Sequence, residues 1–215
     1  MDKVVLFIII ANVLFSYKGF TDNAFFDKYK FQIGPILRGE QIRIFSSGFL
    51  HVDYMHLFMN MFVLYMFSNE VIEWIGILKF VLIYLGSLIA GNTLALSFHK
   101  RDPYYSAVGA SGAVMGIVYS AIMLNPDMRL TFIFFPFIGI PGYIFGVGYL
   151  LYSMYGMKAQ LGSIGHSAHL GGAVGGFILT LALYPRVFID NKLIIIVLAV
   201  PILLMFLFKD KLENR

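Results

Sequence analysis

Two residues in this sequence, a serine and a histidine, could together perform nucleophilic chemistry. Ser111 stands in a Gly-Ala-Ser-Gly quartet that runs from Gly109 to Gly112, and His169 is followed by Leu170 and two glycines. A serine hydroxyl is a poor nucleophile until a base removes its proton, which an imidazole can do. Both residues lie in apolar segments, where an ionisable side chain is costly and therefore indicates function. Because no carboxylate lies near either residue in the sequence, we expect a Ser-His dyad.

Glycines accompany both residues at the spacing that allows helices to pack closely. Gly112 and Gly116 are four residues apart, and Gly172 and Gly176 follow His169 by three and seven residues. Small residues at this spacing let two helix backbones approach each other in a membrane. We expect these two glycine stripes to meet and to bring the serine and the histidine within hydrogen-bond distance. Without the histidine, ordinary helix packing would explain the same glycines.

A second histidine and an asparagine could supply hydrogen-bond donors to the same chemistry. His56 and Asn60 are four residues apart and so share one face of a helix. Fixed donors of this kind stabilise the negative charge that develops on a tetrahedral intermediate. We expect the two side chains and the backbone N–H of Ser111 to form an oxyanion hole. The alternative is that the two side chains only hydrogen-bond neighbouring helices.

The composition places these residues in a membrane protein. Of 215 residues, 59% are hydrophobic and 13% are charged, whereas soluble domains carry about 25% charged residues. The mean hydropathy is +0.80. The net charge of +4 comes from scattered basic residues, which gives no nucleic-acid-binding surface. The absence of cysteine excludes thiolate catalysis, cysteine metal sites and disulfides.

Apolar runs separated by charged and turn residues predict a polytopic bundle of helices. The first run follows Lys3 and lacks a cleavage pattern, so we expect an uncleaved span. A mixed polar loop over 18–53 follows, and Leu130 to Phe137 is typical of an interfacial strand or loop. Pro141 falls in the first turn of the fifth span, and the seventh run contains Pro201 but is still expected to cross. The predicted spans are 4–17, 54–75, 80–98, 105–124, 139–156, 166–184 and 193–208.

The second, fourth and sixth predicted spans run in one direction, so their N-terminal ends share one membrane face. His56 and Asn60 lie near the start of the second span. Ser111 is expected about two turns into the fourth span, and His169 about one turn into the sixth. At about 1.5 Å per residue, all four lie within roughly 10 Å of the same surface. The topology therefore predicts that they share one depth in the membrane, although the distribution of basic residues does not fix which face is nearer.

Further motifs accompany these residues along the chain. In order, the motifs are Gly39-Glu40-Gln41-Ile42-Arg43, Phe49-Leu50-His51, His56-Leu57-Phe58-Met59-Asn60, Gly109-Ala110-Ser111-Gly112 and Ala168-His169-Leu170-Gly171-Gly172. With these motifs, the chain resembles the rhomboid family of intramembrane serine proteases. The resemblance implies an all-α, polytopic membrane helical bundle. Its six-span core would cover residues 1–185, and residues 186–215 would hold the seventh span and a short polar tail.

The resemblance also implies roles and partners. Ser111 would be the nucleophile and His169 the general base, with His56, Asn60 and the Ser111 N–H in the oxyanion hole. Transmembrane segments of other proteins would enter from the bilayer between the second and fifth spans, beneath the 157–165 loop. Neither a metal nor an organic cofactor is implied, and nucleic acid is not an expected partner. The expected location is a bacterial cytoplasmic membrane, and the oligomeric state is not indicated.

The chain departs from the family pattern at two positions. Met115 stands one turn after the serine, where many relatives carry an aromatic residue that stacks on the histidine. The acidic residue that closes the second span is Glu73, displaced by about one position. Among the remaining histidines, we expect His51 to be structural, His166 to line the same wet cavity, and His99 to be solvated in a loop.

Three alternatives belong to other functional classes. An inactive rhomboid-like protein that binds membrane clients would usually lack the serine or the histidine, and both are present. A transporter with histidines at the membrane midplane would commonly show inverted repeats, and none is evident. The sequence has neither the His-Glu-x-x-His motif of zinc proteases nor a pair of intramembrane aspartates, which argues against metallo- and aspartyl proteases.

Overall fold

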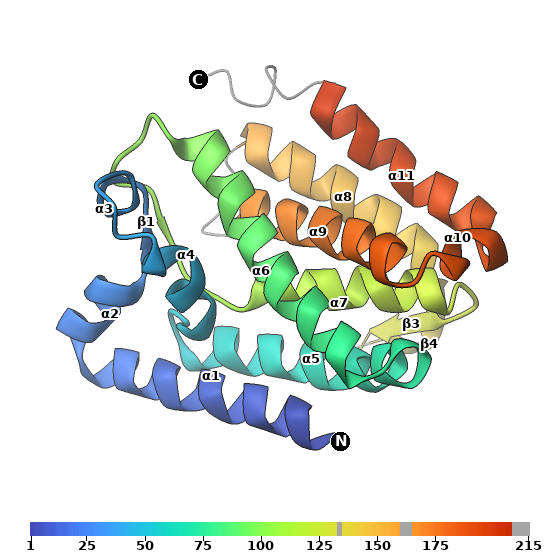
Figure 1. Ribbon diagram of the computed structural model, residues 1–215, viewed down its shortest axis with the longest axis horizontal. Coiled ribbons are helices and arrows are strands. Elements are labelled where there is room, and N and C mark those ends of the chain that lie inside the picture. Colours follow the sequence, from blue (N-terminus) through green and yellow to red (C-terminus); the bar gives the residue numbers. More distant parts are fainter. Residues whose placement is uncertain (133–134, 160–164, 208–215) are drawn as a thin grey trace.

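The computed structural model describes residues 1–132, 135–159 and 165–207 (Figure 1). Helices account for most of these residues, which confirms the predicted all-α membrane bundle. The longer helices are α1 (Lys3–Thr21), α5 (Tyr54–Ile75), α6 (Ile77–His99), α7 (Ser111–Leu124), α8 (Gly142–Ala159), α9 (His166–Leu183) and α11 (Lys192–Leu207). The short elements are α2 (Asn23–Tyr29), α3 (Ile33–Leu37), α4 (Ile42–Ser46), η1 (Ser47–Phe49) and α10 (Arg186–Asp190), with the strands β1 (Phe31–Gln32), β2 (Ser106–Ala107), β3 (Arg129–Phe132) and β4 (Phe135–Pro141).

Helix α7 is the central element of the bundle. Every residue from Gly112 to Leu124 is buried, as expected for a helix that is apolar on all sides. Helices α5 and α9 lie beside α7 and run in the same direction, while α6 crosses in front of α7 and α9 (Figure 1). The N-terminal ends of α5, α7 and α9 therefore lie at one end of the bundle, as predicted from the common direction of the second, fourth and sixth spans.

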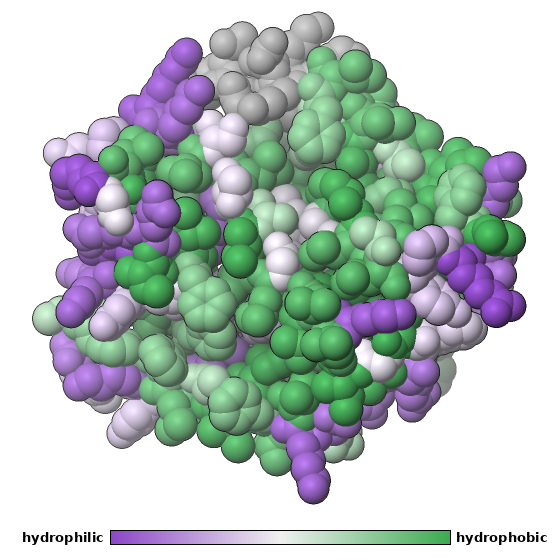
Figure 2. Space-filling view, in the orientation of Figure 1, coloured by the Kyte–Doolittle hydropathy of each residue, from purple (hydrophilic) through white to green (hydrophobic). Residues whose placement is uncertain are grey.

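The outer surface of the bundle is apolar. Within the described residues, three helices, α1, α6 and α9, are long and apolar enough to cross a membrane by length and composition, and α7 and α11 are shorter apolar helices. Large side chains such as Phe7, Leu14 and Leu193 are more than half exposed. Figure 2 shows a broad hydrophobic band over the middle of one face, with hydrophilic residues gathered toward opposite ends. A surface of this kind fits a lipid environment.

Two predicted helix boundaries were wrong by several residues. The second predicted span, 54–75, coincides with α5, but the fourth begins at Ser111 rather than two turns earlier. The preceding segment is extended because Ser106–Ala107 pairs with Phe31–Gln32. Gly109, with φ +134°, then turns the chain into α7. Pro141 ends β4 rather than lying in the first turn of α8.

Residues 18–21 of the predicted 18–53 loop complete α1, and most of the remaining residues form short elements rather than irregular structure. Arg43 holds it together from a buried position: its Nε donates to Glu40 at 2.7 Å, and its Nη1 donates to the carbonyls of Asp27 and Lys30 at 2.6 and 3.1 Å. Residues 130–132 and 135–137 lie in β3 and β4, which pair in antiparallel fashion, as the strand prediction anticipated. The polar tail and residues 160–164 of the predicted covering loop lie outside the described residues.

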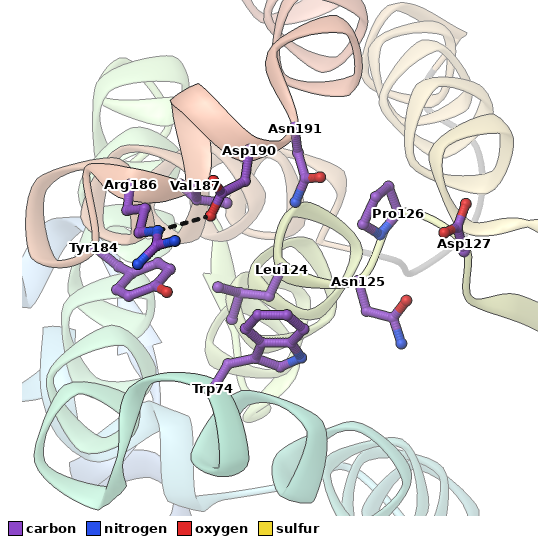
Figure 3. Close-up of a pocket in the computed structure, with 10 residues that line it drawn as sticks. All are labelled: Trp74, Leu124, Asn125, Pro126, Asp127, Tyr184, Arg186, Val187, Asp190 and Asn191. Atoms are coloured by element: carbon purple, nitrogen blue, oxygen red, sulfur yellow. Dashed lines mark ion pairs between the residues drawn. The ribbon is translucent and has the colours of Figure 1, made fainter.

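A pocket of about 340 Å³ lies at the C-terminal end of α7, away from Ser111 (Figure 3). Its lining residues are Trp74, Leu124, Asn125, Pro126, Asp127, Tyr184, Arg186, Val187, Asp190 and Asn191. Arg186 pairs with Asp190 at 3.3 Å on its exposed side. None of the residues predicted to do chemistry lines this pocket, and Ser111 lies at the other end of α7.

Candidate active site

Ser111 and His169 lie within hydrogen-bond distance of each other. The distance from Ser111 Oγ to His169 Nε2 is 2.5 Å, although the two residues are 58 positions apart in the sequence. Ser111 is the first residue of α7 and His169 the fourth residue of α9. This contact has the geometry in which a histidine can take the proton of a serine hydroxyl.

Direct backbone packing between α7 and α9 makes this contact possible. A methyl group at Gly172 would overlap the carbonyl of Gly112, and one at Gly176 would overlap the carbonyl of Gly116. A methyl group at Gly116 would in turn overlap Ser87 on α6. The structure thus places the two glycine stripes against each other. Larger residues at these positions would push the histidine's helix away from the serine.

The other ring nitrogen of His169 contacts a residue that sequence analysis did not identify. The hydroxyl of Tyr149, on α8, lies 2.6 Å from His169 Nδ1, and the two rings are 6.3 Å apart with 23° between their planes. Met115, one turn after the serine, is buried in the core instead. The aromatic ring beside the histidine therefore comes from α8 rather than from α7. Nothing in the sequence distinguishes Tyr149 from the other 12 of the 13 tyrosines.

The hydrogen-bond donors predicted for an oxyanion hole lie beside Ser111. An alanine methyl at position 109 would lie 2.8 Å from His56 Cε1, 3.0 Å from His56 Nε2 and 3.5 Å from Ser111 Oγ, so the His56 ring and the serine both adjoin Gly109. Asn60 is buried and uses one amide N–H for the His56 carbonyl at 2.9 Å, which leaves its second N–H. The N–H of Ser111 heads α7, where helix geometry provides no backbone acceptor.

A buried network supports the loop that precedes Ser111. His51 is fully buried; its Nε2 accepts from the Ala110 N–H at 3.4 Å, and its Nδ1 lies 2.8 Å from the Ser16 hydroxyl. Ser16 donates in turn to the Phe49 carbonyl at 3.0 Å, so His51 Nδ1 carries the proton. Burial, and then the neighbouring His56, lower the pKa of His51 to about 3. His51 is thus a neutral link between α1 and the turn before α7, in keeping with the expected structural role.

The structure corrects the expectation for His99. It is the last residue of α6, stacks on Tyr105 with 3.6 Å between ring centroids, and contacts the Ser167 hydroxyl at 3.1 Å. His99 therefore ties α6 to the start of α9 and is not a solvated loop residue. His166 is buried and packs against Tyr152 and Gly156 of α8.

An acidic residue near the end of α5 lies in a small hydrogen-bond network. Glu70, rather than Glu73, accepts hydrogen bonds from Trp74 at 2.9 Å and from Asn125 at 3.0 Å. It joins the C-terminal ends of α5 and α7. Neither acid is near Ser111. Over residues 1–132, 135–159 and 165–207, no cluster of three His, Cys, Asp or Glu side chains could hold a metal ion.

Comparison with known proteins is consistent with this geometry. Residues 38–186 match the Rhomboid domain. The chain is 30% identical over 141 residues to Rhomboid protein 1, mitochondrial, of Saccharomyces cerevisiae, covering 63% of this chain and 40% of that protein. It is 31% identical over 162 residues to Presenilin-associated rhomboid-like protein, mitochondrial, of Mus musculus, covering 66% and 42%. RHOMBOID-like protein 12, mitochondrial, of Arabidopsis thaliana is 28% identical over 187 residues, covering 79% and 55%.

These matches span between 40% and 55% of the relatives' own length. The domain match covers most of the chain and includes α5 to α9, the helices that carry the serine, both histidines and the asparagine. A polytopic bundle with this domain is a multi-pass membrane protein. The chain belongs to the rhomboid family.

Proposed function

We propose that this protein is an intramembrane serine endopeptidase that cleaves transmembrane segments of other membrane proteins. The observation that carries the proposal is the 2.5 Å contact between Ser111 Oγ and His169 Nε2 inside an apolar bundle. Family membership supports it. Location in a bacterial cytoplasmic membrane, and a division into a 1–185 core and a 186–215 extension, remain predictions.

In the proposed reaction, Ser111 Oγ attacks the carbonyl carbon of the scissile peptide bond while His169 Nε2 takes the hydroxyl proton. The carbonyl oxygen becomes an oxyanion, which the Ser111 N–H, the Asn60 amide and the His56 ring stabilise by hydrogen bonds. The C–N bond breaks as the His169 imidazolium returns its proton to the leaving amine. Water then hydrolyses the acyl-enzyme: His169 Nε2 takes a proton from the water as the water attacks the ester carbonyl carbon. The ester bond breaks as His169 returns that proton to Ser111 Oγ.

Substrate access is proposed to be lateral, with α8 as the moving helix. A hydrogen-bonded helix shields its carbonyl carbons from attack, so the substrate must unwind before cleavage. Gly142, Gly146 and Gly148 lower the helical propensity of α8. The predicted opening lies between α5 and α8.

The test is cleavage of a single-pass transmembrane reporter by the purified protein in detergent, with Ser111→Ala and His169→Ala as controls. Cleavage by the wild type that is lost in both variants is the expected result. Cleavage that persists in Ser111→Ala would remove the nucleophile from the proposal. Labelling of wild-type Ser111 by a fluorophosphonate probe tests the nucleophile without requiring a suitable reporter, and its absence would count against the proposed activity.

A further inference from the structure

Tyr149 is the one polar side chain that reaches the histidine of the dyad from a helix outside α7 and α9, within the residues that the structure describes. Its hydroxyl lies 2.6 Å from His169 Nδ1. Of the two ring nitrogens, Nε2 faces the serine and Nδ1 faces the tyrosine. No carboxylate hydrogen-bonds His169 in the described part of the chain, so Tyr149 occupies the place that an aspartate takes in a catalytic triad.

The two contacts together determine which histidine tautomer is productive. For Nε2 to accept the Ser111 proton, the neutral ring must carry its own proton on Nδ1. That Nδ1–H then donates to the Tyr149 oxygen, and the Tyr149 hydroxyl needs an acceptor of its own. Ser153, one turn further along α8, is fully buried, and its Oγ has no hydrogen-bond partner among the described residues. It lies on the same helix face as Tyr149 and can supply this acceptor.

The position of Tyr149 is itself fixed by the core. Tyr119 of α7 is fully buried, and its hydroxyl donates to the carbonyl of Gly146, three residues before Tyr149. This bond sets the position of α8 along α7, the helix that begins with Ser111. The serine, the histidine and the tyrosine are therefore held by three helices that contact one another.

We propose that Tyr149 is a positioning residue, which orients His169 and selects the tautomer with the proton on Nδ1 through its hydroxyl. The proposal rests on the proposed protease function. In the transition state His169 becomes an imidazolium, and the hydrogen bond from Nδ1–H to the tyrosine oxygen strengthens because its donor is then charged. A neutral tyrosine does this without burying a carboxylate in a membrane-embedded site, which would be costly.

The experiment compares Tyr149→Phe, which keeps the ring and removes the hydroxyl, with Tyr152→Phe, a matched change one turn away on α8. The rate of Ser111 labelling by a fluorophosphonate should fall about 10- to 100-fold in Tyr149→Phe, as expected for the loss of one hydrogen bond to a charged group. With a transmembrane reporter, kcat should fall by a similar factor while KM is unchanged. The acidic limb of the pH–rate profile should move to lower pH, because the imidazolium loses an acceptor.

A readout that does not require catalysis separates this proposal from the protease function. Carbethoxylation of His169 by diethyl pyrocarbonate, followed peptide by peptide by mass spectrometry, should be several-fold faster in Tyr149→Phe, because the ring is no longer restrained. Tyr152→Phe should match the wild type in every measurement. Unchanged labelling, kcat and carbethoxylation in Tyr149→Phe would overturn the positioning role. If wild-type Ser111 is not labelled, the protease function fails, and the carbethoxylation rates still decide the role of Tyr149.

Discussion

Gly109 carries the backbone past the ring of His56 immediately before the proposed nucleophile. Its φ of +134° is unfavourable for other residues, and an alanine methyl would lie 2.8 Å from His56 Cε1. Gly109→Ala should therefore cost about 1–3 kcal/mol of backbone strain and displace His56. We expect a lower thermal unfolding midpoint and at least a tenfold loss of fluorophosphonate labelling.

Gly39→Ala provides the control for strain without displacement. Gly39 has a φ of +106°, but an added methyl would meet nothing within 4 Å. This variant should lower the unfolding midpoint and keep the labelling rate of the folded protein. Equal loss of labelling in both variants would show that strain alone, and not the position of His56, explains the Gly109 result.

His51 should make stability depend on pH. Its pKa is about 3 in the folded protein because it is buried and lies beside His56, whereas an unfolded histidine titrates near 6.5. Between these values the unfolded state binds the extra proton, so stability is complete above about pH 6.5 and falls as the pH is lowered toward 3. The unfolding midpoint should therefore decrease from pH 7 to pH 5. His51→Gln should show a smaller decrease over this range, and an equal decrease would contradict the assignment.

At the scale of whole helices, α8 links substrate access to the chemistry. Gly146 lies where a side chain would meet Leu198 of α11 at 2.8 Å, and its carbonyl accepts from Tyr119. Gly146→Leu should wedge α8 away from its neighbours. We expect slower labelling of Ser111, because Tyr149 moves with α8. We also expect an altered ratio of reporter turnover to labelling, because the proposed opening between α5 and α8 changes.

Gly148→Leu is the matched control for the Gly146 change. A methyl group at Gly148 would meet nothing within 4 Å, and this position is exposed on the same helix. Gly148→Leu should keep the wild-type ratio of reporter turnover to Ser111 labelling. If turnover of a full-length membrane substrate is the same in Gly146→Leu as in the wild type, α8 is not the gate.

Periodicity and motif spacing predicted the helices better than the segments between them. The apolar run over 54–75 is bounded by Asp53, whose carboxylate caps α5, and by Gly76 with a φ of +80°, so both ends of the helix are encoded locally. The start of α7 is not encoded locally, because residues 106–107 are extended by pairing with a strand more than 70 residues earlier. The Tyr149 contact depends on how α8 packs on α7 and α9, which no local pattern records.

At the scale of the whole molecule, the alternating directions of the helices make a prediction about topology. Asp2 precedes α1, Asn191 lies between α10 and α11, and Tyr104 lies between α6 and α7. In Figure 1 the start of α1 and the α10–α11 junction are at one end of the bundle, and the connection from α6 to α7 is at the other. The 215-residue sequence has no cysteine, so single cysteines can be introduced into it at these positions without further changes. A membrane-impermeant maleimide should label Asp2→Cys and Asn191→Cys from one side and Tyr104→Cys from the other.

A cysteine added after Arg215 tests whether α11 completes a seventh crossing. Labelling from the same side as Tyr104→Cys is the expected result, since α11 runs back across the bundle. Labelling from the Asn191 side would mean that the chain crosses six times. The result also supplies the absolute orientation, which the scattered basic residues do not determine.

The separation of 58 positions between Ser111 and His169 has a consequence for biosynthesis. The serine is synthesised and its helix inserted before the histidine has left the ribosome. Until α9 docks against the glycines of α7, the nascent chain carries an inert hydroxyl among its own newly inserted helices and those of neighbouring proteins. Under the proposed function, the membrane is thereby protected from a partly made protease, because proteolytic competence arises only when the last helix of the catalytic core is in place.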